Sequence, residues 1–174
     1  MTMRILRNIL LAGAALLAPA AAEAATASGS AQAVVLATGT MVPVDALRFG
    51  RFFQPTSAGT LTVSEAGVVS VTGGMTGNQN APQVAPGRGP GTFYLEGKKN
   101  GVLKLTTIPA SIILSNGSAT MTVTNLTASV NGGSVFKLDA NGFGVLAIGG
   151  TLNVGANQAY GTYTGTYNIT VTFN

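Results

Sequence analysis

Hydrophobic and polar residues alternate along short stretches of this chain, most clearly at its C-terminal end. Residues 163–174 read YTGTYNITVTFN, so that threonine or asparagine occupies every second position from residue 164 onward. The positions between them carry aromatic and branched side chains, among them Tyr167, Ile169, Val171 and Phe173. A two-residue period is typical of a β-strand with one buried face and one solvated face. We therefore expect a C-terminal strand with these four residues on its core face.

Shorter stretches with the same alternation precede it. They lie at residues 33–44, 47–49, 59–64, 68–72, 92–96, 102–108, 111–114, 118–126, 136–138 and 145–154. Turn signals separate many of them, such as Asn116-Gly117, a pair that suits the positive φ angles of a tight hairpin turn. No stretch after residue 24 shows sustained helical spacing of hydrophobic residues. The sequence predicts an all-β protein, an immunoglobulin-like or pilin-like β-sandwich of about nine to eleven short strands.

The first 24 residues have a different pattern. Arg4 and Arg7 precede an apolar run at residues 9–17, and residues 22–24 (AEA) place small side chains on both sides of a glutamate. A basic start, a short apolar middle and a small-residue exit are typical of a secretory signal. A membrane-spanning helix would need roughly 20 apolar residues, about twice the length of this run. We expect residues 1–24 to be a signal peptide that is removed on export.

The expected mature chain has two parts. Residues 25–45 form an N-terminal strand segment and residues 46–174 a β-sandwich domain, with no transmembrane segment in either. A chain of roughly 150 residues suits one domain and buries about 70% of its unfolded surface on folding. The protein has no cysteine, so no disulfide supports this domain. The core must therefore supply its stability.

The residue types exclude most catalytic chemistry. Histidine and cysteine are both absent, which excludes Ser–His and Cys–His nucleophiles and most zinc-ligand sets. Residues 139–142 (DANG) match only part of a calcium-binding loop and are expected to form a hairpin turn. The acids after the leader are expected at turns or strand ends and suggest no glycosidase pair; they are Asp45, Glu65, Glu96 and Asp139. We predict no catalytic residue, no enzyme activity, no metal and no cofactor.

The basic residues do not suggest a nucleic-acid partner. A nucleic-acid-binding domain gathers its lysines and arginines on one face or helix. Here only Lys98 and Lys99 are adjacent after the leader, and Gly97 and Gly101 bracket them as at the tip of a turn. We interpret the pair as a solvated loop.

A long segment rich in glycine, proline, asparagine and glutamine interrupts the strand pattern at residues 73–91. It offers little to bury, so we expect a surface loop. Loops of this length are often functional or disordered, and the sequence leaves open whether this one binds a partner or is a mobile connector.

Three motifs resemble a known bacterial family. They are residues 47–50 (LRFG), residues 114–123 (LSNGSATMTV) and residues 149–158 (GGTLNVGANQ) followed by residues 161–165 (GTYTG). Together they resemble the family catalogued as domain of unknown function 4402, over most of residues 33–174, and the last motif is the most specific. Members of that family are exported and are similar in style to pilins of chaperone–usher pili, including those that resemble spore coat protein U. Many pilins carry a cysteine pair that this chain lacks.

The resemblance implies a structural, fimbrial subunit of a bacterial surface fibre or coat. Such pilins have an incomplete sandwich that the N-terminal strand of the next subunit completes. The expected partners are further copies of the chain in a homo-polymer, a periplasmic chaperone and an outer-membrane usher. The expected location is the periplasm, the cell surface or the extracellular space. The alternative is a monomeric periplasmic or cell-surface binding module for carbohydrate or adhesion.

The N-terminal segment is the candidate for the donated strand. Added to an open sheet edge, a strand gains main-chain hydrogen bonds while alternate side chains fill pockets. A head-to-tail contact of this kind does not close and builds a filament. The alternative is that the strand pairs within its own domain. The expected interface residues share one phase of residues 32–44: Val34, Leu36, Thr38, Thr40, Val42 and Val44.

Overall fold

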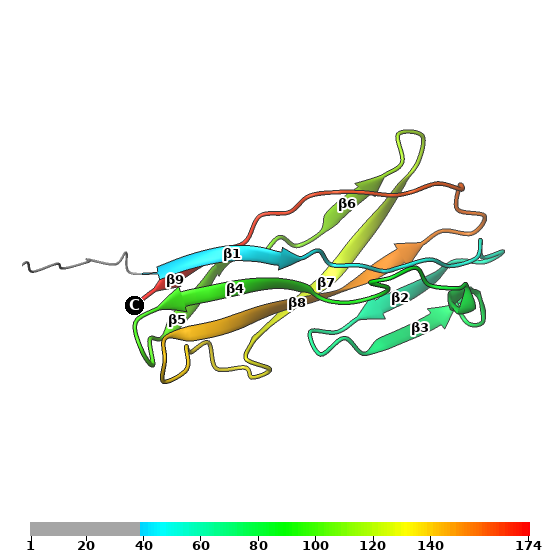
Figure 1. The fold of residues 1–174 in the computed structure, drawn as a ribbon. Helices are drawn as coiled ribbons and strands as arrows, with labels where there is room; N and C mark the ends of the chain where they lie inside the picture. The colour runs from blue at the N-terminus through cyan, green and yellow to red at the C-terminus, as the bar shows by residue number, and fades with distance from the viewer. Residues whose placement is uncertain (1–38) are drawn as a thin grey trace, which may run out of the picture. The chain divides into compact units, whose positions relative to one another are not determined.

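Strands and their connections account for almost all of residues 39–174, the part of the chain that the computed structural model describes (Figure 1). This part contains nine strands and one short 3-10 helix, η1 (Asn78–Asn80). The predicted all-β sandwich is confirmed. The strands are β1 (Gly39–Asp45), β2 (Gly59–Val63), β3 (Val69–Gly73), β4 (Gly91–Gly97), β5 (Leu103–Thr107), β6 (Ile112–Ser115), β7 (Thr120–Val130), β8 (Phe143–Val154) and β9 (Thr170–Phe173).

The larger sheet has seven strands and is built around β8. One edge of β8 pairs with β7, and the other edge pairs first with β4 and then with β2. Outside these strands, β1 pairs with β4, β3 with β2 and β6 with β7, and every pairing is antiparallel. The sheet therefore ends in three outer strands, β1, β3 and β6 (Figure 1).

The sequence of β8 explains its central place. Leu146, Ile148 and Leu152 are buried on its core face. A Cβ atom on Gly149 would lie 2.7 Å from the carbonyl oxygen of Val63, so the glycine permits close packing. Glycines inside a strand often mark a β-bulge, and a bulge is found at the level of Gly149 and Gly150. The extra residue lies on β7, where the register shifts between Thr124 and Thr127.

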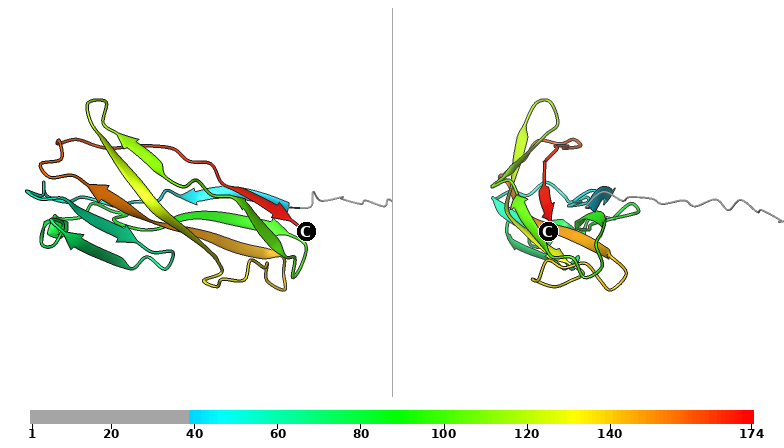
Figure 2. Two further views of the ribbon diagram at one scale, coloured as in Figure 1. Left: turned by 180° about the vertical axis from the view of Figure 1, so that it is seen from behind. Right: turned by 90° about the vertical axis from the view of Figure 1, so that its left-hand side faces the viewer.

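Within residues 39–174, the second sheet contains two strands, β5 and β9. The C-terminal strand is shorter than the expected residues 163–174, because only residues 170–173 form a ladder. Residues 163–169 are irregular apart from a single bridge between Ser115 and Thr164. Both views of Figure 2 show β9 alongside β5, at one end of the larger sheet. The smaller sheet thus covers only part of the core face.

Two hydrophobic clusters make up the core. One includes Leu61, Val123 and Leu152, and the other includes Leu95 and Leu146. No polar or charged side chain is buried among the described residues. Hydrophobic burial and backbone ladders therefore hold this fold together.

Candidate functional site

Among the described residues, the last strand, β9, is paired along one edge only. The N–H of Asn174 donates to the carbonyl oxygen of Val102 (3.0 Å), and Thr172 lies opposite Lys104 in the ladder. Residues of an antiparallel strand direct their backbone groups alternately to the two sides. The intervening residues, Val171 and Phe173, therefore direct their N–H and C=O groups away from β5. No other described strand pairs with that edge.

The first described strand, β1, also has an open edge. The N–H of Gly97 donates to Gly142 on the β8 side, so by alternation Glu96 and Tyr94 face β1. Met41 and Pro43 then direct their backbone groups to the open side. Proline lacks an N–H and is found in sheets mainly at edges. Its place in β1 is consistent with a strand that has no partner on that side.

These two open edges lie close together. A Cβ atom on Gly39 would overlap the ring of Phe173, which shows that the start of β1 rests on the end of β9. Figure 1 shows the same proximity. The two strands make no ladder with each other in the described part of the chain. The sandwich is therefore open along the line where its first and last strands meet.

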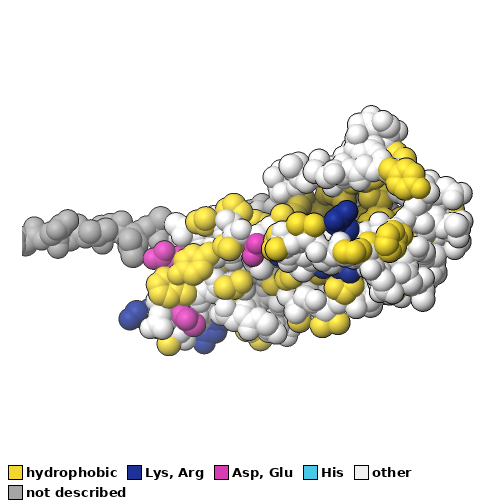
Figure 3. Space-filling model, turned by 45° about the vertical axis from the view of Figure 1, so that its right-hand side comes forward, with side chains coloured by type: hydrophobic (Ala, Val, Ile, Leu, Met, Phe, Trp, Pro, Cys, Tyr) yellow, Lys and Arg dark blue, Asp and Glu magenta, His cyan; other side chains and the backbone are white. Residues whose placement is uncertain are grey.

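A groove continues this opening between the segments that follow β1 and precede β9. Its cavity measures about 690 Å³. The segment 46–54 forms one wall and the segment 158–165 forms the other, and Leu114, Met121 and Leu152 add apolar surface from β6, β7 and β8. Figure 3 shows a hollow whose walls carry hydrophobic side chains, with basic side chains at its rim.

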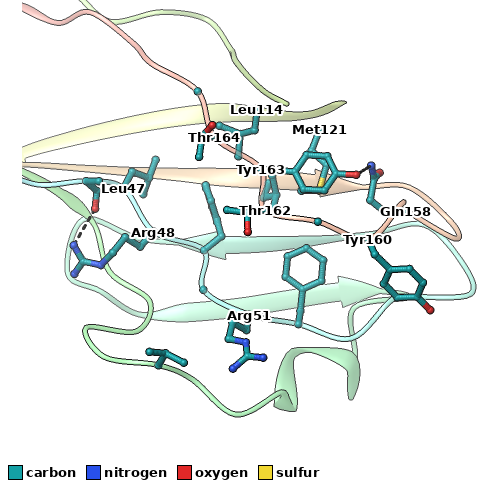
Figure 4. A pocket seen from close by; sticks show the side chains of 18 of the residues that line it. Leu47, Arg48, Arg51, Leu114, Met121, Gln158, Tyr160, Thr162, Tyr163 and Thr164 are labelled. Carbon is teal, nitrogen blue, oxygen red and sulfur yellow. Dashed lines mark hydrogen bonds between the residues drawn. The ribbon is translucent and has the colours of Figure 1, made fainter. Parts of the chain in front are cut away.

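The lining is apolar inside and polar at the mouth. In Figure 4, Leu114, Met121 and Tyr163 lie on one side of the groove, while Arg48 and Arg51 project from the opposite segment. Arg48 is held in place, because its Nη1 atom lies 2.9 Å from Asp45 Oδ1. An extended apolar peptide matches this combination of an apolar interior and a polar rim.

Hydrogen bonds join the two walls at one end of the groove. The amide of Gln54 donates to the carbonyl oxygen of Gln158 (2.9 Å), and the hydroxyl of Tyr160 donates to Gln54 Oε1 (2.9 Å). The N–H of Asn157 also donates to the carbonyl oxygen of Pro55 (2.8 Å). These bonds connect residues about a hundred positions apart in sequence, and they fix the spacing of the walls.

The long loop at residues 73–91 is anchored beside the groove. Arg88 donates to the carbonyl oxygens of Phe49 (2.9 Å), Arg51 (2.6 Å) and Gln79 (2.7 Å). Burial lowers the pKa of Arg88 from its usual value. The loop reaches the groove through Val84, Pro86 and Gly87. A surface loop was expected at these residues. The hydrogen bonds of Arg88 hold the loop beside the groove, where it forms part of the lining.

The expected strand-donation residues fall into two groups. Val34, Leu36 and Thr38 lie outside the described residues. The other three, Thr40, Val42 and Val44, lie in β1, which pairs with β4 of its own chain. Their side chains are exposed, at 53% for Val42 and 64% for Val44, whereas Met41 packs against the core. Intrachain pairing therefore holds for residues 39–45, and the remainder of the expected donor segment lies outside the described residues.

The four expected core residues of the C-terminal strand point inward but are only partly buried. Tyr167, Ile169, Val171 and Phe173 pack against the cluster that contains Leu146. The ring of Tyr167 meets that of Phe93 edge to face, with centroids 6.4 Å apart. Burial raises the pKa of Tyr167. Their incomplete burial shows the side on which the described strands leave the hydrophobic core partly exposed to solvent.

Sequence reasoning missed the groove itself. Leu47 and Phe49 were noted as a short strand and as part of a family motif, yet both line the groove together with Phe52. Leu47 and Phe49 are two positions apart, and this spacing indicated that their side chains share one face of the chain. What the sequence lacked was the information that segments 46–54 and 158–165 lie opposite each other.

The DANG segment forms a turn, as expected. Asp139 Oδ1 accepts the backbone N–H groups of Asn141 (2.8 Å) and Phe143 (2.9 Å). Within residues 39–174 no three acidic, histidine or cysteine side chains gather as a metal site would require. The carboxylate therefore caps its own turn.

This turn gives the protein an expected pH dependence. The N–H groups of Phe143 and then Asn141 lower the pKa of Asp139 from its usual 3.8. A carboxylate whose folded pKa is depressed stabilises the fold fully above its unfolded pKa, and this contribution is lost as the pH falls through the folded pKa. We expect Asp139→Asn to flatten the acid side of a plot of unfolding free energy against pH. Glu65→Gln is the control, and an equal flattening there would contradict the assignment.

Comparison of the sequence with known protein families identifies the family of this chain. The model of a family described as "Domain of unknown function (DUF4402)" matches residues 40–173, from the first strand to the last. No curated protein matches the chain, and no solved structure does. Within residues 39–174 no helix is long and apolar enough to cross a membrane. The matched region includes both walls of the groove and every strand of the described residues, with β1 from Thr40 onward, and the chain belongs to the DUF4402 family.

Proposed function

We propose that this protein is an exported structural subunit of a bacterial surface fibre or coat, with no enzymatic activity. In the proposed assembly, the N-terminal segment of one copy completes the sandwich of the next. One observation carries the proposal. Within residues 39–174 the C-terminal strand β9 is paired on one edge only, and its inward side chains are only partly buried, beside an open apolar groove.

An open edge of this kind favours a strand as its occupant. Val171 and Phe173 offer unpaired backbone groups, and the groove beyond them offers apolar surface. A strand supplies both partners at once, because its main chain bonds to the edge and its alternate side chains enter the core. A small-molecule ligand would satisfy the apolar surface without pairing with the edge.

The chain carries a suitable segment. Residues 25–38 precede β1 and reach about 45 Å when extended at roughly 3.3 Å per residue. That exceeds the extended length of residues 163–173, the C-terminal segment along which such a strand would lie. The segment has no charge and contains Val34 and Leu36 in one phase. Donation between copies is heterologous, so the product is a homo-polymer.

The proposed partners follow from the same opening. A subunit with an exposed apolar groove aggregates unless the groove is covered before assembly. A periplasmic chaperone that lends a strand would provide that cover, and an outer-membrane usher would exchange it for the next subunit.

A peptide exchange experiment tests the proposal. We expect a variant without residues 25–38 to remain unpolymerised and to bind a synthetic peptide of that sequence. At a peptide concentration of about 100 Kd, the peptide should raise the unfolding free energy by about 2.7 kcal/mol. A peptide with Val34→Ser and Leu36→Ser is the matched control. Polymerisation of the shortened variant, or equal stabilisation by both peptides, would contradict donation.

A monomeric binding module is the second candidate, favoured by one feature of the outer face. Tyr94 and Phe143 stack there with centroids 5.7 Å apart and remain partly exposed, beside Val42 and Val145. Exposed aromatic rings are a usual element of carbohydrate sites. This function requires no polymer, so the oligomeric state of the purified protein separates the two candidates.

A further inference from the structure

The outer strand β3 differs from the other two outer strands of the larger sheet. The strand β1 contains a proline, and β6 is bridged on its outer side through Ser115 to Thr164. The strand β3 pairs only with β2 in the described part of the chain, and its ladder runs without a register shift. Its sequence, VSVTG, contains no charge and no proline. In contrast, β1 carries Pro43, a register shift and Asp45 at its open edge. Natural proteins usually protect outer strands with such features.

The ladder shows which backbone groups of β3 are free. The N–H of Ser64 donates to Val68, and the N–H of Gly74 donates to Ala58, both at 2.9 Å. By alternation, Ser70 and Thr72 also exchange hydrogen bonds with β2. Val69 and Val71 therefore direct their N–H and C=O groups to the open side.

We propose that β3 is a docking edge for β3 of a second copy of this chain. An antiparallel pair about a two-fold axis would place Val69 opposite Val71 of the second copy and Ser70 opposite Ser70. The two valines of each copy then form four backbone hydrogen bonds, and the contact is isologous and closed.

The occupant follows from the pattern of the edge. Two donors and two acceptors alternate along Val69 and Val71, so the edge is complementary to itself in the antiparallel direction. Without charge on the strand, two copies can approach without repulsion. The flanking valines add apolar surface, because Val68 is 65% exposed and Val69 is 38% exposed.

This contact is separate from the groove. β1 and β3 lie at opposite ends of the strand order β1-β4-β8-β2-β3. In Figure 1, β3 lies at the lower margin of the sheet, away from β1 and β9. A polymer built through the groove would therefore leave β3 free, and β3 pairing would join polymers side by side. The pairing does not depend on strand donation.

A single cysteine tests the pairing in the full mature chain. Because the protein has no cysteine, Ser70→Cys can form a disulfide only between copies. Opposed residues in a non-hydrogen-bonded antiparallel pair have Cα atoms about 4.5 Å apart, within the range that a disulfide spans. After mild oxidation we expect S70C to shift from the monomer to the dimer position on a non-reducing denaturing gel. The control is Ser118→Cys, at an exposed turn, which should remain monomeric.

The denaturing gel makes this result independent of polymerisation through the groove. A second variant tests the same contact without a covalent bond. Ser70→Lys places two like charges opposite each other on the axis and should reduce side-by-side association in light scattering, whereas Ser118→Lys should not. Equal dimer yields for S70C and S118C, or equal scattering for S70K and S118K, would overturn the proposal.

Discussion

Removal of residues 166–174 is expected to abolish soluble export of the protein. The deletion removes β9 and the inward side chains of Tyr167, Ile169, Val171 and Phe173, which pack against the cluster around Leu146. Full burial of four such side chains contributes at most about 6–12 kcal/mol. Whole domains are stable by only about 5–15 kcal/mol. Because the four side chains are only partly buried, the loss is smaller than this maximum but still a large share of the total stability, and export yield measures it.

Point variants in the same strand provide the control. Val171→Ser should lower the melting temperature, because its side chain packs against the core, whereas Thr172→Ser on the solvated face should not. A truncated protein with normal yield and an unchanged melting temperature would show that β9 is dispensable.

Leu146→Ala is expected to produce the largest loss of stability from a single substitution. Leu146 is 0% exposed and lies in β8, between β4 and β7. Truncation of a buried leucine to alanine costs about 2–5 kcal/mol, because it leaves a cavity. The midpoint of urea unfolding should fall while the slope stays constant.

The neighbouring residue offers a matched comparison. Val145 is 45% exposed on the opposite face of the same strand. Val145→Ala should change the unfolding free energy by no more than roughly 0.5 kcal/mol, as is usual for surface positions. Similar losses at both positions would mean that the core does not lie on the assigned face of β8.

Local patterns predicted the strands because each strand buries one face. The alternation at residues 163–174 survives as inward-facing and outward-facing side chains, even though only residues 170–173 form a ladder. The ladder is short because a ladder extends only as far as a partner strand lies alongside. Pairing with β5 ends at Thr107, and the preceding residues have only the bridge to Ser115. The sequence of the strand alone carries no information about that partner.

The groove could not be predicted for the same reason. Its walls, residues 46–54 and 158–165, are joined across the fold by bonds such as those of Gln54 to Gln158 and Tyr160, residues about a hundred positions away in sequence. The role of Arg88 was equally hidden, since its three acceptors are backbone carbonyls of Phe49, Arg51 and Gln79. Any residue supplies a carbonyl, so no motif marks these contacts.

The pairing of the N-terminal segment depends on position along the chain. Thr40, Val42 and Val44 share one face, and that face is solvated in β1. Periodicity groups residues on a face without saying whether the face meets solvent, its own core or another copy. Residues 39–45 pair with β4, which limits the proposed donor to residues 25–38.

The oligomeric state of the purified mature protein tests the proposed strand donation most directly. We expect polymers that persist in mild denaturant and that appear as fibres by electron microscopy, because each donated strand would be buried in the groove beside β9. A protein that remains a stable monomer at high concentration, with residues 25–38 protected from hydrogen exchange within the same chain, would contradict it.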